Sequence, residues 1–145
     1  MINILIDENI ESIVIKNNIV EELVKKIFKD HNKYYSTISY IISDDQKLSD
    51  LKQNFFNQHV FTDVITFNLE DDGEPIEGEI YISLERVKEN SKIYGQKFST
   101  EFSRILIHGT LHLIGFNDET DDEKENMTNL EDKYIKGMIG TILWF

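Results

Sequence analysis

Hydrophobic and polar residues alternate in some stretches of the chain and recur at helical spacing in others, and the two patterns predict different elements. Alternating or β-branched stretches predict four strands, at Ile2–Ile6, Tyr35–Ser43, Thr62–Asn68 and Glu79–Ser83. Apolar residues at helical spacing predict five helices, at Asn17–Asp30, Asp45–Phe56, Leu84–Tyr94, Thr100–Ile114 and Thr120–Met138. This order predicts an α/β (or α+β) fold, in which a small mixed sheet of about four strands packs against helices.

Three local signals predict where helices begin and end. Asn17 or Asn18 is the expected N-cap of the first helix, because a short amide side chain can accept from a free backbone amide. Thr120-x-x-Glu123 is the pattern of a capping box at the start of the last helix. Gly115 follows the most apolar helix, where a glycine can take a positive φ and end the helix sharply. We therefore expect the chain to double back after Gly115.

Length and composition exclude several classes of protein. A chain of 145 residues predicts one domain, spanning residues 1–145. The absence of cysteine excludes a disulfide scaffold, a thiol nucleophile, an iron–sulfur cluster and a Cys-based zinc finger. No apolar run approaches the roughly 18 residues of a membrane span, and Met1–Ile6 leads directly into acidic residues, unlike a signal peptide. We expect a cytoplasmic protein that does not engage a membrane.

The net charge argues against nucleic acid as a partner, but the charge is unevenly distributed. The chain has 27 acidic and 15 basic side chains, a formal net charge of −12, which repels phosphodiester backbones. The acids concentrate in the expected turn Glu70–Gly78 and along the last helix, whereas residues 81–107 carry five basic against three acidic side chains. The candidate RNA contacts in this basic stretch are Arg86, Lys88, Lys92 and Arg104. The alternative is an ordinary solvated helix surface.

Two histidines four residues apart on the most apolar helix are the strongest chemical signal. At this spacing His108 and His112 project from one face of the helix, so that both imidazoles can bind one metal ion. Gly115 lies three residues beyond His112, and a turn there brings Asp118 to the third corner of a tetrahedron. This is the layout of metzincin-type zinc sites. Three protein ligands leave the fourth position for water, as in catalytic zinc sites.

Gly109 excludes the usual chemistry of zinc peptidases. In H-E-x-x-H enzymes the residue after the first histidine is the glutamate that acts as general base. Gly109 has no side chain and cannot accept a proton. Peptide hydrolysis by that route is therefore disfavoured, and the catalytic base is not evident from the sequence.

Three blocks of the sequence resemble the YbeY family of bacterial zinc-dependent endoribonucleases. Residues 108–118, H-G-T-L-H-L-I-G-F-N-D, resemble the family signature H-G-x-L-H-L-x-G-x-D-H. Residues 62–67 and 78–83 are similar to its T-(D/N)-V-L-S-F and G-D-I-x-I-S strands, so the resemblance covers most of the chain. It implies a mixed α/β fold with one Zn²⁺ in a cleft. It also implies a role in maturing ribosomal RNA, notably the 3′ end of the small-subunit RNA, and in ribosome quality control, with the small subunit and its proteins as partners.

The sequence departs from the family pattern at two places. Asp118 stands where the third histidine usually stands, and two histidines with one carboxylate leave a zinc site at about +1 instead of +2. Many members carry an arginine six residues before the first threonine of the T-(D/N)-V strand, and Phe56 occupies that position here. His59 is either a partial substitute for this arginine or an exposed loop residue.

Three functional hypotheses remain open at this level. The first is an endoribonuclease that cleaves single-stranded ribosomal RNA with a zinc ion held by His108, His112 and Asp118. The second is a ribosome-assembly factor in which the metal is mainly structural, which the net acidity favours. The third is a metal-dependent hydrolase of another substrate.

Overall fold

A four-stranded mixed sheet forms the centre of the molecule. The computed structural model describes residues 1–10, 13–58, 62–138 and 140–143. The sheet has the strand order β1-β2-β4-β3, in which β1, β2 and β4 are parallel and β3 is antiparallel to β4. The strands are β1 (Ile2–Ile6), β2 (Tyr35–Ser43), β3 (Val64–Asn68) and β4 (Ile76–Ser83). The predicted fold class is thus confirmed.

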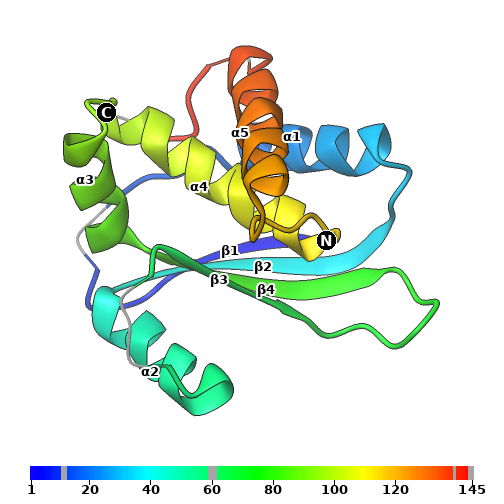
Figure 1. The fold of residues 1–145 in the computed structure, drawn as a ribbon, viewed down its shortest axis with the longest axis horizontal. Helices are drawn as coiled ribbons and strands as arrows, with labels where there is room; N and C mark the ends of the chain where they lie inside the picture. The colour runs from blue at the N-terminus through cyan, green and yellow to red at the C-terminus, as the bar shows by residue number, and fades with distance from the viewer. Residues whose placement is uncertain (11–12, 59–61, 139, 144–145) are drawn as a thin grey trace.

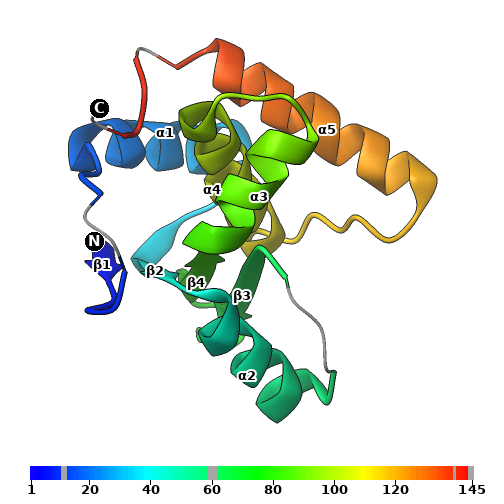
Figure 2. The ribbon, with the colours of Figure 1, turned by 90° about the vertical axis from the view of Figure 1, so that its left-hand side faces the viewer.

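The helices lie on both faces of this sheet, but unequally. They are α1 (Asn17–Asp30), α2 (Asp45–Phe56), α3 (Leu84–Ile93), α4 (Phe98–Leu113) and α5 (Asp121–Lys136). Helices α1, α3, α4 and α5 gather on one face, and α2 lies alone on the other (Figures 1 and 2). None of the helices within the described ranges is long and apolar enough to cross a membrane.

Two local predictions were wrong. The segment predicted as a turn ends earlier, because β4 begins at Ile76 and pairs with β3 beyond the predicted boundary, with the Leu69 amide donating to the Glu77 carbonyl. The N-cap of α1 is Lys16 rather than an asparagine, and no side chain caps it. Pairing with the C-terminal segment positions this helix start instead, since the Lys16 amide donates to the Ile142 carbonyl at 2.7 Å.

The predicted helix ends near the candidate site were confirmed. Thr120 and Glu123 form both hydrogen bonds of a capping box at the start of α5. Gly115 has a φ of 111°, in the region that favours glycine, and follows Ile114, the C-cap residue of α4. The chain therefore reverses between α4 and α5, as expected.

Helix α4 packs closely against the sheet at Gly109. A Cβ atom at this position would lie 2.8 Å from Cγ2 of Ile80 and 2.9 Å from Cγ2 of Val64. These distances are shorter than carbon–carbon contacts in packed proteins, so only glycine allows this approach. The same approach brings His108 and His112, on either side of Gly109, next to β3.

Candidate metal centre

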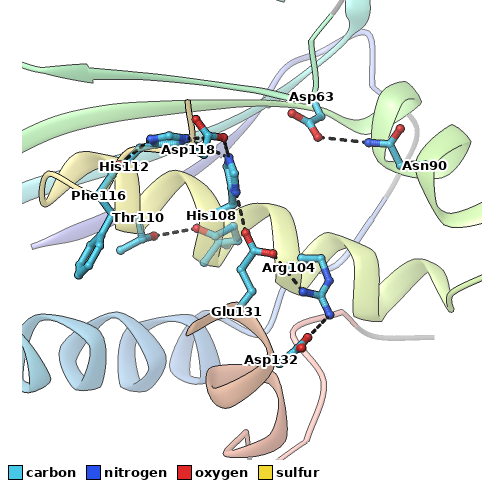
Figure 3. Close-up of polar contacts among 11 residues, drawn as sticks. Asp63, Asn90, Arg104, His108, Thr110, His112, Phe116, Asp118, Glu131 and Asp132 are labelled. Carbon is cyan, nitrogen blue, oxygen red and sulfur yellow. Dashed lines mark hydrogen bonds and ion pairs between the residues drawn. The ribbon is translucent and has the colours of Figure 1, made fainter. Parts of the chain in front are cut away.

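Three side chains converge at the end of α4, from two segments of the chain (Figure 3). The Nε2 atoms of His108 and His112 lie 3.0 Å apart. One carboxylate oxygen of Asp118, Oδ2, lies 3.2 Å from Nε2 of His108 and 3.4 Å from Nε2 of His112. These three residues form a group that could hold a metal ion.

The outer nitrogens of both imidazoles are already hydrogen-bonded, which determines what the inner nitrogens can do. Nδ1 of His112 lies 2.8 Å from the carbonyl oxygen of Phe116, which can only accept, so this nitrogen carries the proton. Nδ1 of His108 lies 2.6 Å from Oε2 of Glu131 and donates to that carboxylate. In each neutral ring Nε2 therefore presents a lone pair to the centre.

The geometry of this group fits a bound cation. Ligand atoms 2.0–2.1 Å from a tetrahedral ion lie about 3.3 Å from one another, close to the three observed separations of 3.0, 3.2 and 3.4 Å. With both rings neutral, two lone pairs and a carboxylate oxygen would face one another and repel, and a bound cation would remove that repulsion. Nitrogen and oxygen donors of this kind suit Zn²⁺ and other divalent transition metals.

The turn after α4 places Asp118 next to the two imidazoles. Gly115 reverses the chain, and the Phe116 amide donates to the Leu111 carbonyl at 3.0 Å. The same turn aims the Phe116 carbonyl at His112. The predicted grouping of two histidines with Asp118 is thus present, and its role as a set of ligands stays a prediction.

A buried carboxylate behind His108 connects the site to α5. Glu131 is 5% exposed and contacts both Nδ1 of His108 and, at 3.0 Å, the guanidinium of Arg104. Arg104 also forms an ion pair with Asp132 at 2.7 Å. Burial by itself would lower the pKa of His108, but the hydrogen bond and charge of Glu131 reverse this, and the pKa lies above its ordinary value.

The two histidines and Asp118 line a pocket of about 360 Å³ between α4, β3 and α2. Its other lining residues are Lys52, Phe56, Thr62, Asp63, Val64, Ile65 and Thr66. The Asp63 carboxylate accepts a hydrogen bond from Asn90 at 3.2 Å, and burial raises its pKa above the usual value for aspartate.

Several of these functional candidates were missed in the sequence. Glu131 lies four residues after Met127 and three before Tyr134, on the buried face of α5, and this helical spacing was the signal that could have found it. Lys52 is an ordinary residue of an amphipathic helix by pattern alone, and Phe56 was noted only as standing where many family members carry an arginine. Asp63 directly precedes a strand inside a recognised block, and that position was the one available signal.

The predicted RNA contacts that fall within the described residues do not line this pocket. Arg104 lies behind the metal group in its ion pairs with α5, and the guanidinium of Arg86 forms an ion pair with Asp45 at 2.7 Å. The ammonium group of Lys88 lies 5.9 Å from the centre of the Phe98 ring. Lys92 is on α3 with Lys88, and His59 lies outside the described residues. Roles for these five residues in RNA binding stay predictions.

Comparisons with known proteins extend over most of the chain. The family model described as Endoribonuclease YbeY matches residues 5–139. A protein named Endoribonuclease YbeY from Christiangramia forsetii is 38% identical over 112 residues, covering 77% of this chain and 78% of that one. One of the same name from Karelsulcia muelleri is 37% identical over 109 residues, covering 75% and 77%.

A solved structure shows a similar arrangement. The solution structure of TM1509 from Thermotoga maritima has a TM-score of 0.59 and is 28% identical in sequence. The match covers 94% of this chain and 87% of that one.

Proposed function

Because the chain belongs to the endoribonuclease YbeY family, we propose that it cleaves single-stranded ribosomal RNA with a zinc ion held by His108, His112 and Asp118. The observation that carries the proposal is the convergence of two imidazole lone pairs and one carboxylate oxygen within 3.4 Å of one another. The proposed task is maturation of the small-subunit RNA, including its 3′ end, and ribosome quality control in the cytoplasm. Its partners are then the small subunit and its proteins.

The ion would supply Lewis acidity to a phosphoryl oxygen or to water. The protein's own residues do the positioning. Glu131 and the Phe116 carbonyl hold the two imidazoles by their Nδ1 atoms, so that both Nε2 atoms face the pocket. Asp63 lines the same pocket and, among the described lining residues, carries the one carboxylate outside the ligand group. We assign it the role of accepting a proton during cleavage.

The direct test replaces His112 with alanine. His112→Ala is expected to lose stoichiometric zinc and RNA cleavage together, because two remaining ligands bind zinc weakly. His31→Gln, a change at a histidine outside the group, is expected to retain both. Elemental analysis paired with a cleavage assay, with and without chelator, measures the two properties. Cleavage retained by His112→Ala without bound metal would remove the metal mechanism.

A ribosome-assembly factor with a structural metal is the second candidate. The net charge of −12 and the engagement of Arg86 and Arg104 in ion pairs with carboxylates favour it, because both reduce the charge available for RNA. Purified protein that binds small ribosomal subunits but cuts no RNA with any tested divalent metal would support this candidate over the nuclease.

A further inference from the structure

A group of aromatic side chains lies on the face of the sheet that carries α2. The aromatic cluster consists of Phe55 and Phe56 from α2, Phe67 from β3 and Tyr81 from β4. The ring centroid of Phe67 lies 5.3 Å from that of Phe55, 5.9 Å from that of Phe56 and 5.9 Å from that of Tyr81. Helix α2 lies on the side of the sheet opposite α4 (Figure 2), and the ring contacts place the cluster on this side, next to β3.

Two rings of the cluster are exposed. Phe55 is 67% exposed and Phe56 is 44% exposed, although large aromatic side chains are usually covered. Phe67 holds both rings in place: Phe56 stacks on it at an interplanar angle of 24°, and Phe55 meets it edge-on at 68°. The result is a set of packed rings rather than isolated exposed side chains.

The aromatic cluster is continuous with the metal pocket. Phe56 lines the pocket together with His108, His112 and Asp118. Lys52, one helical turn before Phe56, lines it as well, and its ammonium group lies 4.8 Å from the centre of the Phe56 ring. Among the described residues that line the pocket, Lys52 is the one basic side chain apart from the histidines.

The two ends of the aromatic cluster differ in charge. The cation of Lys52 lies at the pocket end, whereas at the far end the Tyr81 hydroxyl donates to the Glu79 carboxylate at 2.6 Å. A ligand with an anionic group next to a planar ring system is therefore oriented with its anion toward the pocket. A nucleotide in a single strand has this form, because its base can stack while its phosphate binds a cation.

We propose that Phe55 and Phe56 form a stacking subsite for an unpaired base of the RNA strand adjoining the cleaved phosphodiester, and that Lys52 binds the phosphate of that nucleotide. The proposal rests on the proposed function of the metal pocket. It gives a physical reason for single-stranded substrate, since a base held in a duplex has no free face for stacking. It also gives an acidic protein a local means of holding RNA.

The test measures binding separately from cleavage. Fluorescence polarisation with a labelled single-stranded oligouridylate, in the presence of a chelator, reports affinity while no metal-dependent cleavage occurs. Phe55→Ala/Phe56→Ala is expected to weaken binding about tenfold, because the variant loses the stack of one base and a single stack contributes at this level. Phe56→Tyr is expected to keep the affinity, since it keeps the ring. Tyr34→Ala, a control at a 79%-exposed tyrosine outside the cluster, is expected to change nothing.

An abasic oligonucleotide of equal length distinguishes stacking from a general structural effect. Wild-type protein is expected to bind it about tenfold more weakly than oligouridylate, whereas the double variant binds both equally. Lys52→Ala is expected to lower the slope of log affinity against log salt by about 0.7, and Lys47→Ala on the same helix to leave it unchanged.

Three outcomes would overturn the subsite. They are equal binding of oligouridylate by wild type and double variant, no preference of wild type for bases over abasic sites, and absence of binding by wild type. A wild-type dimer in sedimentation that the double variant abolishes would assign the aromatic cluster to a second copy instead. None of these results bears on whether the protein cleaves RNA, which the His112→Ala experiment decides.

Discussion

Oε2 of Glu131 lies 2.6 Å from Nδ1 of His108, although 23 positions separate the two residues in the chain. The hydrogen bond joins α5 to the helix that carries both histidines, and it fixes the proton of His108 on the nitrogen away from the pocket (Figure 3). A carboxylate behind a metal-binding imidazole also makes that imidazole a stronger donor. The acidic last helix therefore contributes directly to the proposed centre.

Replacing this carboxylate with an amide is expected to weaken metal binding. Glu131→Gln removes the charge that polarises His108, and outer carboxylates of this type contribute about 10- to 100-fold in metal affinity. Competition with a chromophoric chelator measures the change. Asp132→Asn is the matched control, since Asp132 also contacts Arg104 but not His108. Equal zinc affinity in wild type and Glu131→Gln would contradict the assigned role.

Asp63 is expected to act in cleavage without holding the metal. Asp63→Asn keeps the size of the side chain and removes its ability to accept a proton, so kcat is expected to fall about 10²- to 10⁴-fold. Metal content and KM are expected to stay close to wild type. Loss of the metal in this variant would make Asp63 a ligand, and an unchanged kcat would leave it without a role in the reaction.

The carboxylate ligand is expected to set the pH range of activity. Asp118→His changes the site from about +1 to about +2 and increases its Lewis acidity, so the acidic limb of the kcat/KM profile is expected to move to lower pH. The acidic limb of Asn117→Asp is measured for comparison, because this variant adds a charge beside the site without replacing a ligand. A shift of the limb to higher pH in Asp118→His would oppose this account.

Gly109 is expected to be required for packing. Gly109→Ala places a Cβ less than 3 Å from Ile80 and Val64, and overpacking of this kind costs about 1–3 kcal/mol in the free energy of unfolding. Gly137→Ala is the control, because its nearest neighbour would lie 3.5 Å away and its φ of −81° suits any residue. Urea denaturation of both variants gives the comparison. Similar stabilities would show that α4 can shift without cost.

Glu101, which is 3% exposed on α4, is expected to make stability depend on pH. Burial raises its pKa above the usual value, and the nearby charge of Arg104 offsets part of that rise. The contribution of Glu101 to the free energy of unfolding is therefore fully present below its pKa in the unfolded chain, about 4.3. This contribution is lost as the pH rises through the pKa of Glu101 in the folded protein. Glu101→Gln is expected to raise Tm at pH 7 and to have little effect at pH 4.

The control for this prediction is Glu125→Gln on the exposed side of α5, which is expected to leave Tm unchanged at both pH values. Thermal melts followed by circular dichroism measure the difference. A Tm gain in Glu101→Gln that is equal at pH 4 and pH 7 would show that the effect is not one of ionisation.

Local signals predicted the elements of the fold well. Hydrophobic periodicity is a property of each segment, and it correctly predicted the order of strands and helices. The capping box at Thr120 and the positive φ of Gly115 depend on neighbouring residues alone, and both were confirmed. The N-cap of α1 was predicted wrongly because a distant segment, through Ile142, positions Lys16. Here a tertiary hydrogen bond, rather than a side-chain cap, positions the start of the helix.

The sequence by itself therefore determined the grouping of His108, His112 and Asp118, because a helical turn and a glycine turn set their spacing within eleven residues. Only the tertiary structure decided what surrounds them. Glu131 behind His108, and Asp63, Lys52 and Phe56 in the pocket, come from other elements of the chain. Charge patterning predicted a basic strip on α3 and α4, but packing pairs Arg86 and Arg104 with acids. No local pattern encodes which distant residues meet, since the packing of helices on the sheet determines it.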